Sequence, residues 1–275
     1  MIQAVRKMPL SALAGLVITL LFFLMALSAP LIAPYGLGEV VGKVWEPSSA
    51  RFWLGTDNIG RDLLSRMIYG GRTTIFIASA ATLISFTIGS VLGFTAVVMG
   101  GWCDVLLSRF VDLIMSIPGL IFALVILSVV PATILVLILV MAFLDATRVY
   151  RLSRSVAESI YAMDYVEAAK LRGEGTGWIV LREILPNALS PLVSELGLRF
   201  IFMVLYLSTL SFLGLGIQPP STDWGAIVKE NSDGLVYGIT AALAPAIAIA
   251  TLAISVNLVA DWVLSLTTSL KGGRS

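Results

Sequence analysis

Long stretches without a charged residue limit the folds that this chain can adopt. No Asp, Glu, Lys or Arg lies within residues 8–38, 73–103 or 113–144. Each stretch exceeds the roughly 20 residues that an α-helix needs to cross the hydrocarbon core of a bilayer. With 58% hydrophobic and 13% charged residues, the 275-residue chain is predicted to be an all-α integral membrane protein.

The first apolar stretch follows Arg6 and Lys7. Its start resembles a signal peptide, and small residues near Ala26 resemble a cleavage site. The apolar part is longer than the about 7–15 residues of a typical signal peptide, and Pro30 follows closely. We interpret it as an uncleaved anchor helix whose N-terminus stays in the cytoplasm.

Residues 35–71 carry charges of both signs and favour neither side of the membrane. Within them, residues 62–70 place their apolar side chains on one helical face, which predicts a helix lying along the membrane interface. Gly55, Asp57 and Gly60 are typical of a turn that precedes and caps such a helix.

The next two stretches predict three spans. In residues 73–103, Gly89 and Gly93 lie four apart, a spacing that lets helices pack closely in lipid. Residues 113–144 are too long for one span at about 1.5 Å per residue. We therefore expect Pro131 to mark a turn between spans at about 107–129 and 132–149.

A charged segment then interrupts the apolar sequence. Apolar residues at spacings of three and four predict a helix over about 156–170. Ala168 and Ala169 would let another surface approach it closely. Three glycines permit backbone angles that end this helix, and Pro186 opens the next apolar run; the glycines are Gly173, Gly175 and Gly177. The prediction is a short, two-armed elbow.

The remaining chain predicts a fifth span at about 188–214 and a sixth at about 238–264, separated by a polar loop. Six basic side chains between residues 145 and 183 then fall on the same side as the N-terminus, as the positive-inside rule requires. We divide the chain into three parts: an anchor helix with a periplasmic interfacial segment (1–71), a five-helix core with a cytoplasmic loop at about 145–186 (72–266), and a cytoplasmic tail (267–275).

The elbow resembles the "EAA" signature of permeases from binding-protein-dependent ABC importers. The matching residues are Glu167, Ala168, Ala169, Gly173, Leu185 and Pro186. Three further stretches are similar to the dipeptide, oligopeptide and nickel branch, in its shorter C-type subunit: residues 54–72, 151–154 and 210–225. Phe52 stands where that branch usually has a histidine, so no role of that histidine transfers.

The resemblance implies a type I ABC importer permease fold with six spans and a cytoplasmic coupling helix, in a bacterial inner membrane. It implies that the elbow docks on an ATPase. Arg151 and Arg154 match basic positions leading into the elbow, and they either contact the ATPase or anchor the chain beside lipid head groups. Implied partners are a second related permease, two ABC ATPases and a periplasmic or lipid-anchored substrate-binding protein.

The resemblance also implies a periplasmic gate at the C-terminal end of the fifth span. Its residues would be Gly214, Gly216, Pro219 and Pro220. The alternative is that glycines and prolines simply end a helix there.

The sequence contains no motif that is typical of a catalytic site. It has no phosphate-binding loop, so ATP and Mg²⁺ are expected only in the partner ATPases, and no cofactor on this chain. Without histidine, and with Cys103 as the single cysteine, we expect no catalytic site and no metal site. A net charge of +1 gives no case for nucleic acid.

Charged residues inside the predicted spans are expected to pair locally, as Glu195 with Arg199 and Arg109 with Asp112. Few carboxylates then remain for a carrier driven by an ion gradient, which is the alternative function. The sequence does not distinguish dipeptides, oligopeptides, nickel complexes or other small molecules as cargo.

Overall fold

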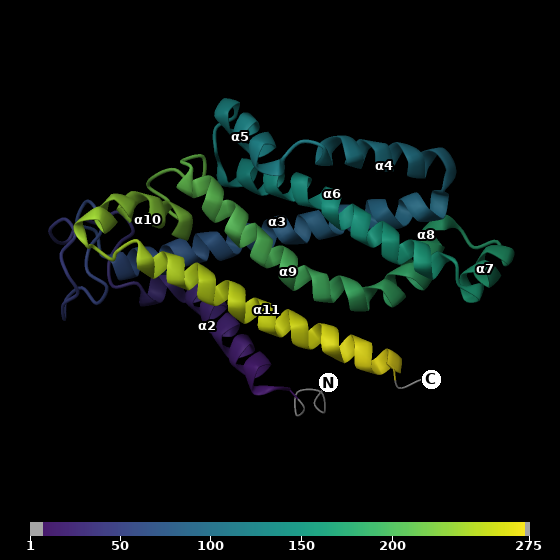
Figure 1. The fold of residues 1–275 in the computed structure, drawn as a ribbon, viewed down its shortest axis with the longest axis horizontal. Coiled ribbons are helices and arrows are strands. Elements are labelled where there is room, and N and C mark those ends of the chain that lie inside the picture. The colour runs from purple at the N-terminus through teal and green to yellow at the C-terminus, as the bar shows by residue number, and fades with distance from the viewer. Residues whose placement is uncertain (1–7, 273–275) are drawn as a thin grey trace.

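The computed structural model describes residues 8–272, with side chains for residues 8–265, and every regular element in this part is a helix. Five long helices form an elongated bundle (Figure 1): α2 (Leu10–Ile32), α3 (Leu63–Met99), α6 (Ile134–Tyr161), α9 (Leu185–Phe212) and α11 (Leu243–Gly272). Shorter elements lie between them: α4 (Gly101–Met115), α5 (Gly119–Val129), α7 (Asp164–Leu171), α8 (Thr176–Trp178), the π-helix η1 (Ile179–Ile184), α10 (Trp224–Asn231) and the 3-10 helix η2 (Ser232–Tyr237).

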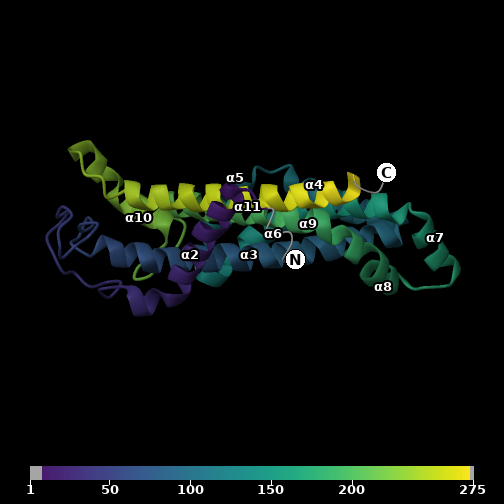
Figure 2. The same cartoon turned by 90° about the horizontal axis from the view of Figure 1, so that it is seen from below.

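The bundle has two distinct ends. Short helix α10 and the 33–62 segment lie at one end, and α7 lies at the other, as both views show (Figures 1 and 2). We call them the α10 end and the α7 end. These connecting segments therefore form two groups, one at each end of the bundle.

Within the described residues, four helices are long and apolar enough to cross a membrane: α2, α3, the continuous run Thr176–Phe212 and Leu243–Ser265. Helices α4 and α5 add a fifth candidate if they count as one bent span. Helix α6 is not among them because it carries Asp145, Arg148 and Arg151. The chain is therefore an all-helical integral membrane protein with four or five candidate spans.

Helix α3 lies at the centre of the bundle, and its closest neighbour is α6. A Cβ atom added to Gly89 would lie 2.7 Å from the backbone oxygen of Ala146, and one added to Gly93 would lie 2.8 Å from that of Tyr150. Both glycines therefore permit backbone contact between the two helices, and the close packing predicted for them is confirmed.

The interfacial helix expected over 62–70 is instead the start of α3. Asp62 caps α3 by accepting a hydrogen bond from the backbone N–H of Ser65 at 2.8 Å. No proline interrupts the 37 residues that follow, and Ile68 and Gly70 are buried. The division placed between residues 71 and 72 consequently falls inside α3.

The span expected over 107–129 is broken. Helices α4 and α5 meet at 79° across residues 116–118. Pro118 lacks a backbone N–H and disfavours helical geometry at Ile117, which explains the break. The turn near Pro131 is confirmed, since α5 ends at Val129 and Thr133 caps α6.

Helix α6 extends to Tyr161, twelve residues beyond the end expected at 149. Two of its charged side chains, Asp145 and Arg154, have ion-pair partners on neighbouring helices, so burying them does not end the helix. The single helix expected over 156–170 is two helices, because the chain leaves helical geometry at Met163 before α7. Helix α11 starts at Leu243 rather than 238, after Gly238 closes η2 at φ +75°.

Candidate functional site

The α7 end presents an isolated helix of eight residues, α7. Val166 and Ala169 are fully buried against the bundle. On the other side, Glu167 and Ala168 are exposed, and the Leu171 side chain is 84% exposed. The exposed side of the helix therefore combines the apolar side chains of Ala168 and Leu171 with the carboxylates of Asp164 and Glu167. The sequence reasoning missed Leu171, although its spacing of three from Ala168 places it on that face.

Gly173 ends α7. Its φ of +82° is a left-handed angle that favours glycine, and its N–H bonds the carbonyl of Lys170 at 2.9 Å. Gly177 does not break the helix as expected, because it lies inside α8. Leu185 and Pro186 begin α9 directly after η1, so the returning arm is one continuous run of helical turns.

Side chains fix α7 to the bundle. The Lys170 ammonium lies 3.3 Å from the centre of the Tyr161 ring, which is a close cation–π contact. The Tyr161 hydroxyl donates to the backbone oxygen of Val98 at 3.3 Å. Tyr161 thus connects α7 with the ends of α3 and α6.

The two predicted arginines behave differently. Arg154 donates to both carboxylate oxygens of Asp104 on α4, at 2.6 and 2.7 Å, and lies 3.3 Å from Glu158. Arg151 is exposed, and its nearest polar contact is the sulfur of Met115 at 3.8 Å. Arg154 therefore ties α6 to α4, whereas Arg151 remains open to a partner or to lipid.

The α10 end is held by a buried network of charges. Arg66, 2% exposed, forms ion pairs of 2.6 Å with Asp57 and 2.5 Å with Glu230. Arg61 pairs with the same two carboxylates at 2.6 and 2.7 Å. Thr222 accepts a further bond from Arg66 at 3.1 Å. Two of the motifs found in the sequence, 54–72 and 210–225, are thus joined in space.

Asp57 is ionised in this network. Burial by itself raises the pKa of its carboxyl, but hydrogen bonds from the backbone N–H groups of Arg61 and Ile59 and the nearby guanidinium groups lower it below the ordinary value of 3.8. The network therefore contains a carboxylate that stays charged at neutral pH.

The four residues predicted to form a gate lie in one turn between α9 and α10. Gly214 adopts φ +87°, Gly216 is buried against Ser211, and Pro219 and Pro220 are exposed. Ser211 donates to the fully buried Asp223, which caps α10. The structure brings the four residues together at the end of the bundle opposite α7.

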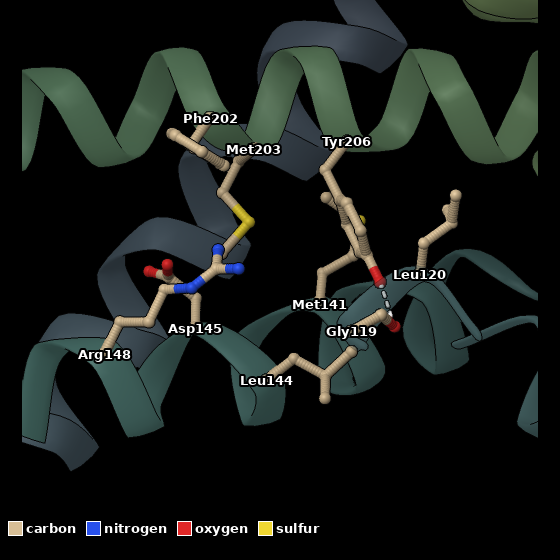
Figure 3. A pocket seen from close by; sticks show the side chains of 9 residues that line it. All are labelled: Gly119, Leu120, Met141, Leu144, Asp145, Arg148, Phe202, Met203 and Tyr206. Atoms are coloured by element: carbon tan, nitrogen blue, oxygen red, sulfur yellow. Dashed lines mark hydrogen bonds between the residues drawn. The ribbon is translucent and has the colours of Figure 1, made fainter. Parts of the chain in front are cut away.

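A cavity of about 240 Å³ opens between α5, α6 and α9. Figure 3 shows Arg148 reaching into it from α6, with Tyr206 and Phe202 on α9. Beside it, Arg199 bonds Glu195 at 2.5–2.8 Å, which confirms the predicted pair, and also reaches Asp145 at 3.4 Å.

The described residues bring together neither the second predicted ion pair nor a set of metal ligands. Arg109 and Asp112 form no ion pair there, so that predicted pairing is wrong. Across the same residues, no group of three or more Cys, Asp or Glu side chains is placed to hold a metal ion. The cytoplasmic tail predicted over 267–275 lies outside the residues whose side chains are described.

Residues 85–267 match the model of a family described as "Binding-protein-dependent transport system inner membrane component". The chain is 33% identical, over 257 residues, to the di/tripeptide transport system permease protein DppC of Pseudomonas aeruginosa (strain UCBPP-PA14), covering 91% of this chain and 85% of that protein. It is 30% identical, over 276 residues, to the probable D,D-dipeptide transport system permease protein DdpC of Escherichia coli (strain K12), covering 100% and 92%. The glutathione transport system permease protein GsiD of Pectobacterium atrosepticum is 29% identical over 252 residues.

Proposed function

This chain belongs to the family of inner membrane components of binding-protein-dependent transport systems, and from that premise we propose that it carries peptides across the membrane as one half of a translocation pathway. As a permease component of an ABC importer it is a multi-pass inner-membrane protein. Peptide cargo is supported by relatives whose names include di/tripeptide and dipeptide transport. Family membership does not favour an ion-gradient carrier.

The observation that supports coupling to an ATPase is the exposed face of α7. Glu167, Ala168 and Leu171 face outward from a helix that is anchored to α3 and α6 through Tyr161. An apolar side chain that is 84% exposed is buried most favourably in a groove on a partner. We assign α7 as the coupling helix that a separate ATPase binds, and we assign ATP and Mg²⁺ to that ATPase.

The proposed topology has six spans: α2, α3, the bent pair α4–α5, α6, the run ending in α9, and α11. The α7 end and both termini face the cytoplasm, because the basic residues of the α7 region follow the positive-inside rule. The α10 end then faces the periplasm, where Gly214, Gly216, Pro219 and Pro220 form the gate beneath the substrate-binding protein. A second related permease and two ATPases complete the complex.

The coupling role is tested by Glu167→Arg, which reverses the charge of one exposed side chain on α7. The matched control is Ser159→Arg, which places the same side chain on exposed surface of α6 near the same end. We expect Glu167→Arg to insert normally but to lower substrate-stimulated ATP hydrolysis and uptake by the liposome-reconstituted complex at least tenfold, with the control near wild type. Full coupled turnover in Glu167→Arg would refute the assignment.

A further inference from the structure

We propose that the cavity between α5, α6 and α9 binds the terminal carboxylate of the transported peptide, with the Arg148 guanidinium as the recognising group. The inference rests on the proposed function, since it takes a peptide as the cargo. It adds a ligand site inside the membrane part of this chain and assigns a residue to it.

The Arg148 guanidinium has no ion pair of its own. Asp145, one turn earlier on α6, lines the same cavity and attracts Arg148 electrostatically, but its carboxylate is directed to other groups, accepting from Ser85 at 3.0 Å and from Arg199 at 3.4 Å. In the described part of the chain no carboxylate comes within 4.0 Å of the Arg148 guanidinium. Its contact is with the Phe202 ring, 5.2 Å from the ring centre. The neighbouring cation, Arg199, is by contrast fully paired.

The place of this cation in the bundle indicates a functional role. Arg148 lies fourteen residues into α6, about 21 Å along its axis. Charged side chains at membrane depth are expensive and mark pathways for polar ligands. The break between α4 and α5 lies beside it, and Gly119, the first residue after that break, lines the same cavity. Irregular backbone at membrane depth is tolerated where it is buried in protein or lines a water-filled cavity.

The cavity fits one end of a peptide. Its volume of about 240 Å³ is below the roughly 300–1,000 Å³ of sites that enclose a whole small molecule. Leu120, Met141, Leu144 and Met203 form apolar walls that suit a side chain (Figure 3). The Tyr206 hydroxyl donates to the Gly119 oxygen at 2.7 Å, so its own oxygen is free to accept a peptide N–H.

A carboxylate is the ligand chemistry that this arrangement favours. A guanidinium presents two parallel N–H groups that match the two carboxylate oxygens, and apolar surroundings strengthen that bond. The phosphate of an anionic lipid offers similar oxygens. We assign the site to the peptide because the walls provide space for a side chain next to the cation.

The test uses the complete transporter in nanodiscs without the binding protein, so that only the membrane site selects the ligand. Equilibrium binding is measured for a dipeptide and for its C-terminally amidated form, in wild type, Arg148→Gln and Arg148→Lys. Arg109→Gln is the matched control, because it makes the same change at an exposed arginine on α4 outside the cavity. Each measurement is made with zwitterionic lipid alone and with added phosphatidylglycerol.

We expect wild type and Arg109→Gln to bind the free acid at least tenfold more tightly than the amide. Arg148→Gln should bind both forms equally weakly, Arg148→Lys should keep part of the preference, and phosphatidylglycerol should have no effect. Equal binding of acid and amide by wild type would overturn the proposal, as would a preference that survives in Arg148→Gln. Loss of the preference on adding phosphatidylglycerol would assign the site to lipid and overturn it as well.

A second measurement, uptake by the same complex with its binding protein and ATP, distinguishes failure of this site from failure of the proposed function. Uptake of dipeptide without any acid preference in the binding assay would reject only this site. Absence of ATP-driven dipeptide uptake, with another solute transported, would reject peptide as the cargo.

Discussion

Arg66 is a buried cation whose charge is neutralised by side chains from two distant parts of the chain. Asp57 lies nine residues before it, and Glu230 lies 164 residues after it. The sequence could suggest the Glu195–Arg199 pair, because a spacing of four puts both on one helix face. It could not suggest Arg66–Glu230 or Arg199–Asp145, because neither pair has a local spacing and each depends on how helices pack.

The first prediction concerns removal of that cation. Arg66→Met leaves two carboxylates of a buried network with only Arg61 as partner, so we expect a loss of about 3–5 kcal/mol of stability. Thermal unfolding of the purified complex in detergent measures it. Arg72→Met, at an exposed arginine further along α3, is the control and should stay within about 0.5 kcal/mol of wild type. Equal unfolding temperatures for the two variants would contradict the network's structural role.

The second prediction is the pH dependence that follows from Asp57. Its pKa is lower in the folded protein than the ordinary 3.8, so the folded state favours the charged form. The stabilisation is complete above about pH 5 and is lost as the pH falls through 3.8 towards the folded pKa. The stability difference between wild type and Asp57→Asn should therefore shrink as the pH falls from 5 to 3. A difference that is constant over this range would show that Asp57 does not titrate as described.

At the scale of elements, helix ends were easier to predict than helix extents. Pro131 and Gly173 mark chain turns because proline lacks an N–H and glycine accepts a positive φ. The length of α6 was underestimated, because charged residues were taken to mark the end of the span. Asp104 and Arg199, on other helices, provide the partners that let α6 continue.

The third prediction tests the contact between α3 and α6. Gly89→Leu would push a side chain against the backbone oxygen of Ala146 and against Val149. Overpacking of this kind costs about 1–3 kcal/mol or separates the helices. We expect a lower unfolding temperature and less assembled complex on size-exclusion chromatography. Ile88→Leu, at the neighbouring exposed position, should leave both unchanged. Normal assembly of Gly89→Leu would mean that the two helices are not held in close contact.

For the whole molecule, the account requires that its two ends lie on opposite sides of the membrane. The fourth prediction uses Cys103→Ser as a background and adds either Leu171→Cys at the α7 end or Trp53→Cys at the α10 end. Both side chains are well exposed, at 84% and 73%. In cells that lack the ATPase subunits, which would otherwise cover residue 171, a membrane-impermeant maleimide should label Leu171→Cys only in inside-out vesicles and Trp53→Cys only in spheroplasts. Labelling of both variants from one side would reject the topology.

The family and the overall helical architecture could be anticipated because short motifs and long charge-free runs are local properties of the sequence. The joining of segments 54–72 and 210–225 through Arg66 and Thr222 could not, because it depends on the three-dimensional arrangement. The cavity beside Arg148 was missed for the same reason, since three helices contribute to it.

The most direct test of the central claim is photo-cross-linking from Leu171→Cys, in the Cys103→Ser background, carrying a benzophenone maleimide in the assembled transporter. If α7 is the element that a separate ATPase moves, the cross-linked product contains the ATPase, and its yield changes when ATP hydrolysis is arrested by vanadate. A product that contains only the substrate-binding protein, or no cross-link to the ATPase in a complex that still transports, would contradict the account.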